Sequence, residues 1–559
     1  MASQAESRPP ILDWPNEAGF QTLHEQHDPT SLPITGSIPA YAAGVLYRTG
    51  PSSYKVGKFS CSHWFDGFGQ TYRFEIIAEE DGTTRVVYNS RKANDALIDR
   101  ARKAGSVGGI TFGQRRDPCV GIFGKVLSIF RPAPSKESND PSLVNVAVTL
   151  RPDMPGLPSL PPSKREIGHS PNIGIKNLWT GTDSARFKQL DPQTLEPLAT
   201  SSQKSLHSRL KGPLSGAHSQ TDPLTGDVFN YNLELGLHAT YRIFRTSAST
   251  GETEILATFP SKAAYIHSFF LSEDYVTLAI WSSRYEKNGL KIPIEQNILE
   301  AISPFSPSNL THWYVIDRRH GHGLIAEFES PAAFSFHSIN AWQETNDEED
   351  MDILAELIEF ENLDVLHKFY YENLTSEGKN SVSFDAKFGQ TSTPRLARYR
   401  LENIPAKPLK RSSHSSSKEA RKAKLELTVE KSKVGELPTI NPKFVTRQHR
   451  YVYGVVNRGY SSFLDGICKT DTRTGEALFW DDRGCTPGEA IFVANPAGDG
   501  EDDGVLMSVV LDGKAVGKER SFLLVLDAKT MKEMARAEVN GVVGLGFHGV
   551  HVQQSEIKV

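Results

Sequence analysis

Hairpin turns recur along this chain, and they restrict its fold more than any other feature. Two strand-like runs, TYRFEIIA from Thr71 and TRVVY from Thr84, flank a turn that carries Asp81-Gly82. Asp and Thr side chains bond the backbone of such turns, and Gly accepts a positive φ. The same arrangement returns as DPQTL, DPLTG, ASTGE, DTRTG and DAKTM, which begin at Asp191, Asp222, Ala248, Asp471 and Asp527. The sequence therefore predicts a long series of antiparallel hairpins.

This series extends over most of the 559 residues and favours a β-propeller over a β-sandwich. We expect one all-β domain over residues 1–559, with an N-terminal extension over about 1–30. Division into about seven blades would give each about 80 residues, against ~40–45 in a WD40 blade. The additional residues are expected to form long loops stacked on one face.

Three segments interrupt the strand pattern. Residues 349–362 (EDMDILAELIEFEN) have the apolar spacing of a helix, and a helix is predicted there. Residues 285–304 mix apolar and polar residues and are expected to form a loop. Lys407 to Lys424 is basic, rich in Ser and nearly free of apolar residues. A disordered surface insertion is therefore predicted over about 405–430.

Composition excludes several classes of protein. The chain is 38% hydrophobic and 23% charged with a formal net charge of −5, which is typical of a globular protein without a nucleic-acid partner. The four cysteines form no C-x-x-C pair, so a reducing compartment is favoured over a disulfide framework. They are Cys61, Cys119, Cys468 and Cys485. Because neither a signal-peptide core nor a bilayer-spanning apolar run is seen, we expect a cytoplasmic protein. No obligate protein partner is inferred.

Four of the 17 histidines lie in apolar or Gly-rich surroundings: His218, His267, His337 and His548. A propeller brings the first strands of its blades together around one axis, so histidines far apart in sequence could converge there. Imidazole is a good ligand for Fe, Cu, Zn and Ni. The spacing alone does not separate this set from hydrogen-bonded core histidines. It also leaves rival candidates, which are His63, His207, His312, His320, His322 and His551.

Several longer motifs resemble the carotenoid cleavage oxygenase family. GVLYRTGPS and HWFDGFGQTYRF resemble its N-terminal signature, and FHSINAWQE resembles its F-H-x-x-N-A-x-E segment. ELPTINPKFVTRQHRYVYG and GEAIFVANPAGDGEDDGVLMSVV resemble two later blocks, and GFHG its terminal histidine motif. The resemblance runs in the same order from about residue 30 to the C-terminus.

The resemblance implies a seven-bladed propeller, capped by loops and helices on the metal-bearing face, with Fe(2+) on its axis. Its ligands would be His218, His267, His337 and His548. Family members orient three such histidines with carboxylates, which fix the ring tautomer. Glu436 is expected to face His337, and Glu489 to face His548. At the third position the chain has Asp183 where the family usually has Glu. Because Asp is shorter by one methylene, a longer or water-bridged link to His267 is expected. Thr182 matches a threonine close to a vacant iron position.

Four neutral imidazoles would leave two of six octahedral positions for O2 and a substrate double bond beside it. No G-x-G-x-x-G fingerprint of a nicotinamide or flavin cofactor is found. A dioxygenase that cleaves an alkene into two carbonyls without an added reductant is therefore predicted. An apolar polyene would need an apolar tunnel, for which Phe269, Phe270, Phe334, Phe336 and Phe547 are candidate wall residues; ordinary core packing is the alternative.

The tunnel mouth should reach a membrane, because carotenoids dissolve there. Residues 289–305 could form an apolar patch that contacts the membrane surface, or they could be loop core. The motifs are most similar to the fungal branch of the family, which favours cleavage of torulene or a related carotenoid to an apo-carotenal. Symmetric cleavage of β-carotene to retinal and cleavage of a stilbene such as resveratrol are the alternatives. A silent lipid-binding propeller is the alternative outside enzymology.

Overall fold

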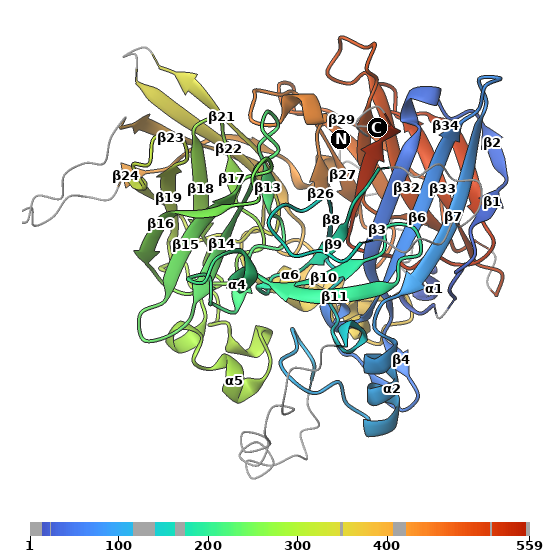
Figure 1. The fold of residues 1–559 in the computed structure, drawn as a ribbon, viewed down its shortest axis with the longest axis horizontal. Helices are drawn as coiled ribbons and strands as arrows, with labels where there is room; N and C mark the ends of the chain where they lie inside the picture. The colour runs from blue at the N-terminus through green and yellow to red at the C-terminus, as the bar shows by residue number, and fades with distance from the viewer. Residues whose placement is uncertain are drawn as a thin grey trace, which may run out of the picture.

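The predicted hairpins form seven β-sheets, which are the blades of a seven-bladed β-propeller (Figure 1). A computed structural model describes residues 14–22, 24–115, 140–161, 174–346, 350–405, 421–514 and 517–554. Each of the recurring Asp-Thr turns connects two neighbouring strands of one sheet. In the DPQTL turn, Asp191 Oδ1 accepts hydrogen bonds from the backbone N–H groups of Gln193 and Thr194. The prediction of successive hairpins is confirmed.

The first three sheets contain the N-terminal half of the chain and the C-terminal strand. In the first sheet the order is β35 (His548–Gln553), β3 (Gly44–Ser53), β6 (Phe68–Ala78), β7 (Thr84–Lys92) and β1 (Thr30–Leu32). The second contains β8 (Thr149–Pro152), β9 (Leu178–Gly181), β10 (Arg186–Leu190) and β11 (Pro197–Ser202). The third contains β12 (Leu214–Ser215), β13 (Gln220–Thr221), β14 (Val228–Glu234), β15 (Thr240–Thr246) and β16 (Thr253–Pro260).

The remaining sheets follow in chain order. The fourth contains β17 (Phe270–Leu271), β18 (Tyr275–Ile280), β19 (Thr311–Asp317), β20 (Leu324–Ser330) and β24 (Arg421–Lys422). The fifth contains β21 (Ser338–Thr345), β22 (Met351–Glu359), β23 (Arg395–Ile404) and β25 (Lys424–Val429). The sixth contains β26 (Glu436–Thr439), β27 (Tyr451–Val456), β28 (Gly466–Asp471) and β29 (Ala477–Trp480). The seventh contains β30 (Cys485–Pro487), β31 (Ile491–Ala494), β32 (Gly504–Asp512), β33 (Arg520–Asp527), β34 (Glu533–Val539) and β2 (Ile34–Gly36). A separate hairpin pairs β4 (Lys55–Val56) with β5 (Phe59–Ser60).

Both ends of the chain take part in closing the ring. The C-terminal strand β35 pairs antiparallel with β3, and the N-terminal strand β2 pairs antiparallel with β34. Figure 1 shows the first sheet, in blue, beside the seventh, in red. The first strands of neighbouring sheets also contact one another, as β17 does with β21 and β31 with β35. Residues that begin or precede these strands are therefore gathered around one axis.

Short helices interrupt the strands, and several of them lie over one cavity. They are α1 (Glu17–Phe20), α2 (Asp95–Ala104), α4 (Gln203–Leu206), α5 (Ile292–Glu295), α6 (Asp364–Lys368), α7 (Tyr371–Leu374) and α8 (Ser381–Phe388). The 3-10 turns are η2 (Ala40–Ala42), η3 (Trp64–Asp66), η4 (Pro141–Leu143), η5 (Glu286–Gly289), η6 (Leu299–Ala301), η7 (Lys431–Lys433) and η8 (Pro442–Phe444). Residues of α2, α5, α6 and α8 line the cavity that also contains three of the candidate ligands. The predicted loop and helix cap is present.

The helix predicted over 349–362 is wrong, because residues 351–359 form the buried strand β22. The charged residues of this strand are also buried. Arginines of the neighbouring strand β23 neutralise them. Glu356 pairs across the strands with Arg398, and Glu359 with Arg395. The apolar spacing thus came from a strand that is covered on both faces.

The structure describes part of the predicted terminal extension, and part of the insertion predicted to be disordered is instead ordered. Residues 14–22 pack against the propeller, and Trp14 is buried with its Nε1 donating to the Cys485 carbonyl at 3.2 Å. Of the insertion predicted over about 405–430, residues 421–429 contain β24 and β25. Residues 1–13 and 406–420 lie outside the described residues.

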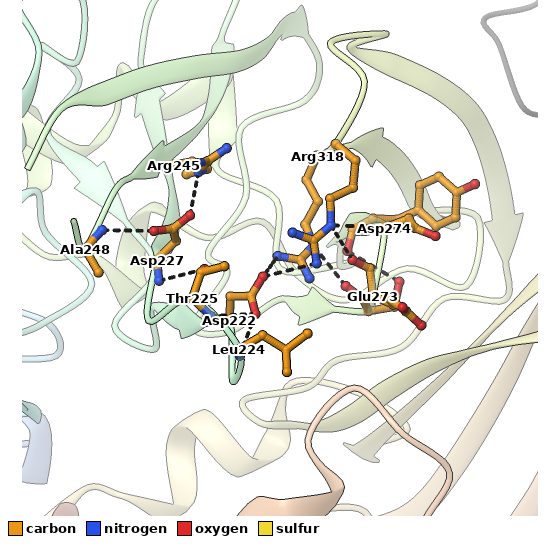
Figure 2. A network of polar contacts seen from close by, with 12 residues as sticks. Asp222, Leu224, Thr225, Asp227, Arg245, Ala248, Glu273, Asp274 and Arg318 are labelled. Carbon is orange, nitrogen blue, oxygen red and sulfur yellow. Dashed lines mark hydrogen bonds and ion pairs between the residues drawn. The ribbon is translucent and has the colours of Figure 1, made fainter. Parts of the chain in front are cut away.

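Polar networks connect neighbouring blades outside the axis, as Figure 2 shows for the third and fourth sheets. Arg318, directly after β19, donates from Nη1 to Asp222 Oδ2 at 2.6 Å. Both side chains are fully buried. Asp222 also begins one of the recurring turns, so the same carboxylate closes its own hairpin and fixes the next blade.

Candidate metal centre

The four predicted histidines come from four different sheets and meet on the axis. His218 lies between β12 and β13, and His267 precedes β17. His337 directly precedes β21, and His548 is the first residue of β35. One ring nitrogen from each lies within 4.8 Å of the others. Distances of 3.0 Å and 3.3 Å separate His548 Nε2 from the Nε2 atoms of His218 and His337, respectively.

Three of these imidazoles are held from behind by carboxylates. His337 Nδ1 lies 2.5 Å from Glu436 Oε2, and His548 Nδ1 lies 2.8 Å from Glu489 Oε1. Both pairs are those expected from the sequence. A carboxylate that accepts the Nδ1 proton leaves the Nε2 lone pair directed at the centre.

Asp183 also reaches its histidine directly. Its Oδ1 lies 2.8 Å from His267 Nδ1, the same distance as in the Glu489 pair, so the expected longer or water-bridged link is not observed. The Ser215 N–H holds the Asp183 carbonyl at 2.9 Å, and the Tyr265 hydroxyl donates to Asp183 Oδ2 at 3.0 Å. The backbone position thus offsets the missing methylene.

Further donors fix the two glutamates. Arg48 Nη1 donates to Glu489 Oε2 at 2.9 Å, and the Gly549 N–H donates to the same oxygen at 2.7 Å. The Leu437 N–H donates to Glu436 Oε2 at 2.8 Å. Arg48 and Tyr265 were not predicted from the sequence. Arg48 stands within the GVLYRTGPS motif, whereas only the fold brings Tyr265 to Asp183.

The electrostatics of the cluster favour a bound cation. Burial, and then the neighbouring imidazoles, lower the pKa values of His218 and His548 well below the ordinary value for histidine. The rings are therefore neutral at physiological pH, and their Nε2 atoms lie 3.0 Å apart. Two nitrogens at right angles around a metal, each about 2.1 Å from it, would be separated by about 3.0 Å. The donor set thus fits a transition metal ion that prefers imidazole.

A cavity of about 1990 Å³ opens onto the cluster. His267, His337 and His548 line it, together with Thr182, Phe336 and Phe547. Other aromatic residues, which were not predicted from the sequence, also line the cavity: Phe59, Trp64, Phe65, Phe68, Phe112, Tyr265, Tyr285, Phe360, Phe369 and Phe463. Trp64 and Phe65 belong to the HWFDGFGQTYRF motif.

The other predicted wall phenylalanines lie in the core and not on the cavity wall. Phe269 packs edge-on against Tyr231 at 6.3 Å between ring centroids, and Phe270 stacks on Trp313 at 5.7 Å. Phe334 contacts the cavity residue Phe336 from behind, at 4.7 Å. For Phe269, Phe270 and Phe334, packing in the propeller core is what the structure shows.

The rival histidines have other partners. His63 Nε2 contacts the Leu366 carbonyl at 2.9 Å, and His551 Nε2 contacts the Ala42 carbonyl at 3.2 Å. His207 Nδ1 accepts the Arg209 N–H. His312 pairs with Glu329, and His320 and His322 gather around Asp317 in the surface turn after β19. Two groups of side chains among the described residues could hold a metal ion, and of these the axial cluster is the one that lines the large cavity.

The sequence is similar to those of known proteins over most of its length. Residues 19–553 match the model of the RPE65 family, described as retinal pigment epithelial membrane protein. A carotenoid dioxygenase of Neurospora crassa is 43% identical over 97% of this chain and 91% of its own length. A torulene dioxygenase of Fusarium fujikuroi is 42% identical over 96% of this chain and 94% of its own length. The chain therefore belongs to the RPE65 and carotenoid oxygenase family.

The fold is also that of a solved member of this group. A Synechocystis apocarotenoid oxygenase matches with a TM-score of 0.73 at 21% identity, covering 98% of this chain and 100% of the other. In the part of the chain that the structure describes, none of the helices combines the length and apolar character needed to cross a bilayer.

Proposed function

We propose that this protein is a non-haem iron(II) dioxygenase that cleaves a conjugated carbon–carbon double bond of a carotenoid, torulene or a relative, into aldehyde products. The observation that carries the proposal is the four-histidine cluster at the wall of a large aromatic cavity. The names of the two fungal relatives support the substrate class. As ligands we propose His218, His267, His337 and His548, with Asp183, Glu436 and Glu489 orienting three of them.

The residues of this chain would have separate tasks. The four imidazoles would hold Fe(II), and the carboxylates would keep the Nε2 lone pairs aimed at it. Bound Fe(II) would supply the place where O2 meets the electron-rich double bond. Phe336 and Phe547 would pack against the polyene and exclude water beside the histidines, and Thr182 would limit what reaches the centre.

Cavity size favours a long substrate over a stilbene. Pockets for small ligands commonly measure ≈ 300–1,000 Å³. The volume of about 1990 Å³ exceeds what a two-ring stilbene would fill, whereas a carotenoid chain needs an extended space. Carotenoid cleavage is thus the better supported activity.

The test is anaerobic loading with Fe(II), followed by O2 and a panel of torulene, β-carotene, an apo-carotenal and resveratrol. One iron per chain and aldehyde products from torulene, identified by mass, are expected. Retinal from β-carotene would indicate symmetric cleavage, and products from resveratrol alone would indicate stilbene cleavage. A protein that retains no iron and yields no product would be a silent lipid-binding propeller.

We also propose peripheral contact with a membrane at the cavity mouth. Of the predicted apolar segment 289–305, Leu290 and Ile294 are 44% and 49% exposed, while Ile292, Leu299 and Ile302 are buried. The backbone joins Ile110, also exposed, to this region through the Thr111–Gln296 hydrogen bond. Exposed aliphatic residues beside an apolar cavity favour a membrane surface.

Liposome flotation with the full chain tests this contact. The double variant Leu290→Glu with Ile294→Glu should lose flotation while keeping its fold. Leu478→Glu is the matched control, because Leu478 is equally exposed, at 49%, on β29 of the sixth sheet. Equal flotation of both proteins, or none by the wild type, would reject the contact.

A further inference from the structure

One lysine on the cavity wall has no hydrogen-bond partner among the residues that the structure describes. Lys368, the last residue of α6, is 8% exposed, and its Nζ makes no hydrogen bond to the described residues. Asp385 Oδ1 on α8 is 3.8 Å away, beyond hydrogen-bond distance. The Phe384 ring lies 5.5 Å from Nζ. Lys368 and Asp385 both line the large cavity.

Four other basic side chains on this wall differ from Lys368 because each has a polar partner within hydrogen-bond distance. Arg100 donates to the Val107 carbonyl. The remaining pairs are Arg115 with Glu372, Lys431 with Glu361, and Arg458 with Asp465 and Asp481. Arg186 also has an interaction partner. Within the described chain, Lys368 is therefore the basic side chain of this cavity whose buried charged group makes no hydrogen bond.

Burial makes this unused donor costly. An ammonium group in an apolar cavity loses its hydration, and one carboxylate beyond hydrogen-bond distance does not replace it. Burial accordingly lowers the pKa of Lys368. The amine can donate hydrogen bonds in either protonation state, so an oxygen acceptor brought by a ligand would satisfy it.

Lys368 lines the same cavity as the candidate metal centre. Phe336 directly precedes the ligand candidate His337, and the Phe369 ring lies 5.9 Å from that of Phe336. Lys368 directly precedes Phe369, and both residues line the cavity. A polyene held against Phe336 and Phe369 could therefore extend toward Lys368 while its central double bonds remain beside the histidines.

We propose that Lys368 Nζ binds an oxygen atom on one end group of the polyene, a hydroxyl or a carbonyl. This inference rests on the proposed function and narrows its substrate class. A pure hydrocarbon would leave Nζ without a partner, whereas an oxygenated carotenoid of the same length would satisfy it. The substrate would then come from a reaction that oxygenates a carotenoid end, either hydroxylation or an earlier oxidative cleavage. Lys368 is then a specificity-determining residue and not one of the candidate metal ligands.

The experiment compares a hydrocarbon carotenoid with its end-hydroxylated analogue and with an aldehyde-ended apo-carotenoid. Dissociation constants are measured without oxygen on the iron-loaded protein, and kcat/KM with oxygen. The wild type should prefer at least one of the oxygenated compounds by about 10–100-fold, as expected for a buried charge-assisted hydrogen bond. Lys368→Met, which keeps an apolar stem of similar length, should remove the preference by weakening the oxygenated ligand alone.

Asp385→Asn is the matched control for the 3.8 Å ion pair between α6 and α8. It should keep the preference if Lys368 contacts the ligand. Equal loss of preference in Asp385→Asn and Lys368→Met would assign the lysine to structure and overturn the inference. So would a wild type that binds and cleaves all three compounds equally. Absence of binding and cleavage with every compound would instead reject the proposed function.

Discussion

At the scale of single residues, the carboxylates decide how well the histidines can hold a metal. Glu436 Oε2 accepts from His337 Nδ1 at 2.5 Å and from the Leu437 N–H at 2.8 Å, so one oxygen fixes both a ring and a strand start. A negative acceptor raises the basicity of the opposite ring nitrogen. The strength of the metal site therefore depends on residues that would never contact the ion.

Glu436→Gln should weaken iron retention by about 10–100-fold, because a neutral amide oxygen is a poorer acceptor for the imidazole proton. The measurement is competition with a chelator of known affinity. Glu344→Gln serves as control, since Glu344 is on β21 of the neighbouring sheet and pairs with Arg400 away from the centre. Similar iron affinities for the two variants would contradict the orienting role.

All three carboxylates could be predicted, Glu436 and Glu489 from family motifs and Asp183 from the position where the family usually has Glu. The directness of the Asp183 link could not. It depends on where the turn between β9 and β10 places the backbone, and a hydrogen bond to Ser215 in the next sheet fixes that position. From side-chain length alone, a gap between Asp183 and His267 was predicted. The backbone at Asp183 lies close enough to His267 for a direct hydrogen bond.

At the scale of secondary structure, β22 shows why buried charge misleads sequence patterns. Glu356 is fully buried and accepts from Arg398 Nε at 2.7 Å, while His449 Nε2 of the next sheet lies 2.9 Å from its other oxygen. Burial alone would raise the pKa of Glu356, but these two partners lower it. Glu356 is therefore ionised in the core between the fifth and sixth sheets.

Glu356→Gln should lower the free energy of unfolding by about 3 kcal/mol or more, because it leaves the partly buried Arg398 and the buried His449 without the carboxylate that contacts both. Glu426→Gln on β25 of the same sheet should cost less than about 1 kcal/mol, since its pair with Arg400 is partly exposed. Urea unfolding of the two variants measures the difference. Equal losses would mean that the buried pair is already balanced by water or by other residues.

At the scale of the whole molecule, the hairpins were predictable, but closure of the ring was not. Each hairpin is encoded locally, by two strand-like runs and the turn residues between them. The pairings of β35 with β3 and of β2 with β34 join opposite ends of the chain, and no local pattern encodes them. The same applies to the convergence of the four histidines, for which family motifs supplied what spacing could not.

Because the candidate ligands come from four sheets, a bound ion would also join the blades. Iron that binds only the folded ring should raise the free energy of unfolding by about 2.7 kcal/mol at a free concentration of 100 times Kd. Thermal unfolding with and without Fe(II), under anaerobic conditions, measures this as an increase in Tm. His337→Ala should lose the increase and remain folded, whereas His238→Ala, on an exposed loop, should keep it. An equal increase in both variants would show that the ion binds outside the cluster. An ion at the axis that lost one of its four ligands would bind the folded protein more weakly and would raise Tm less.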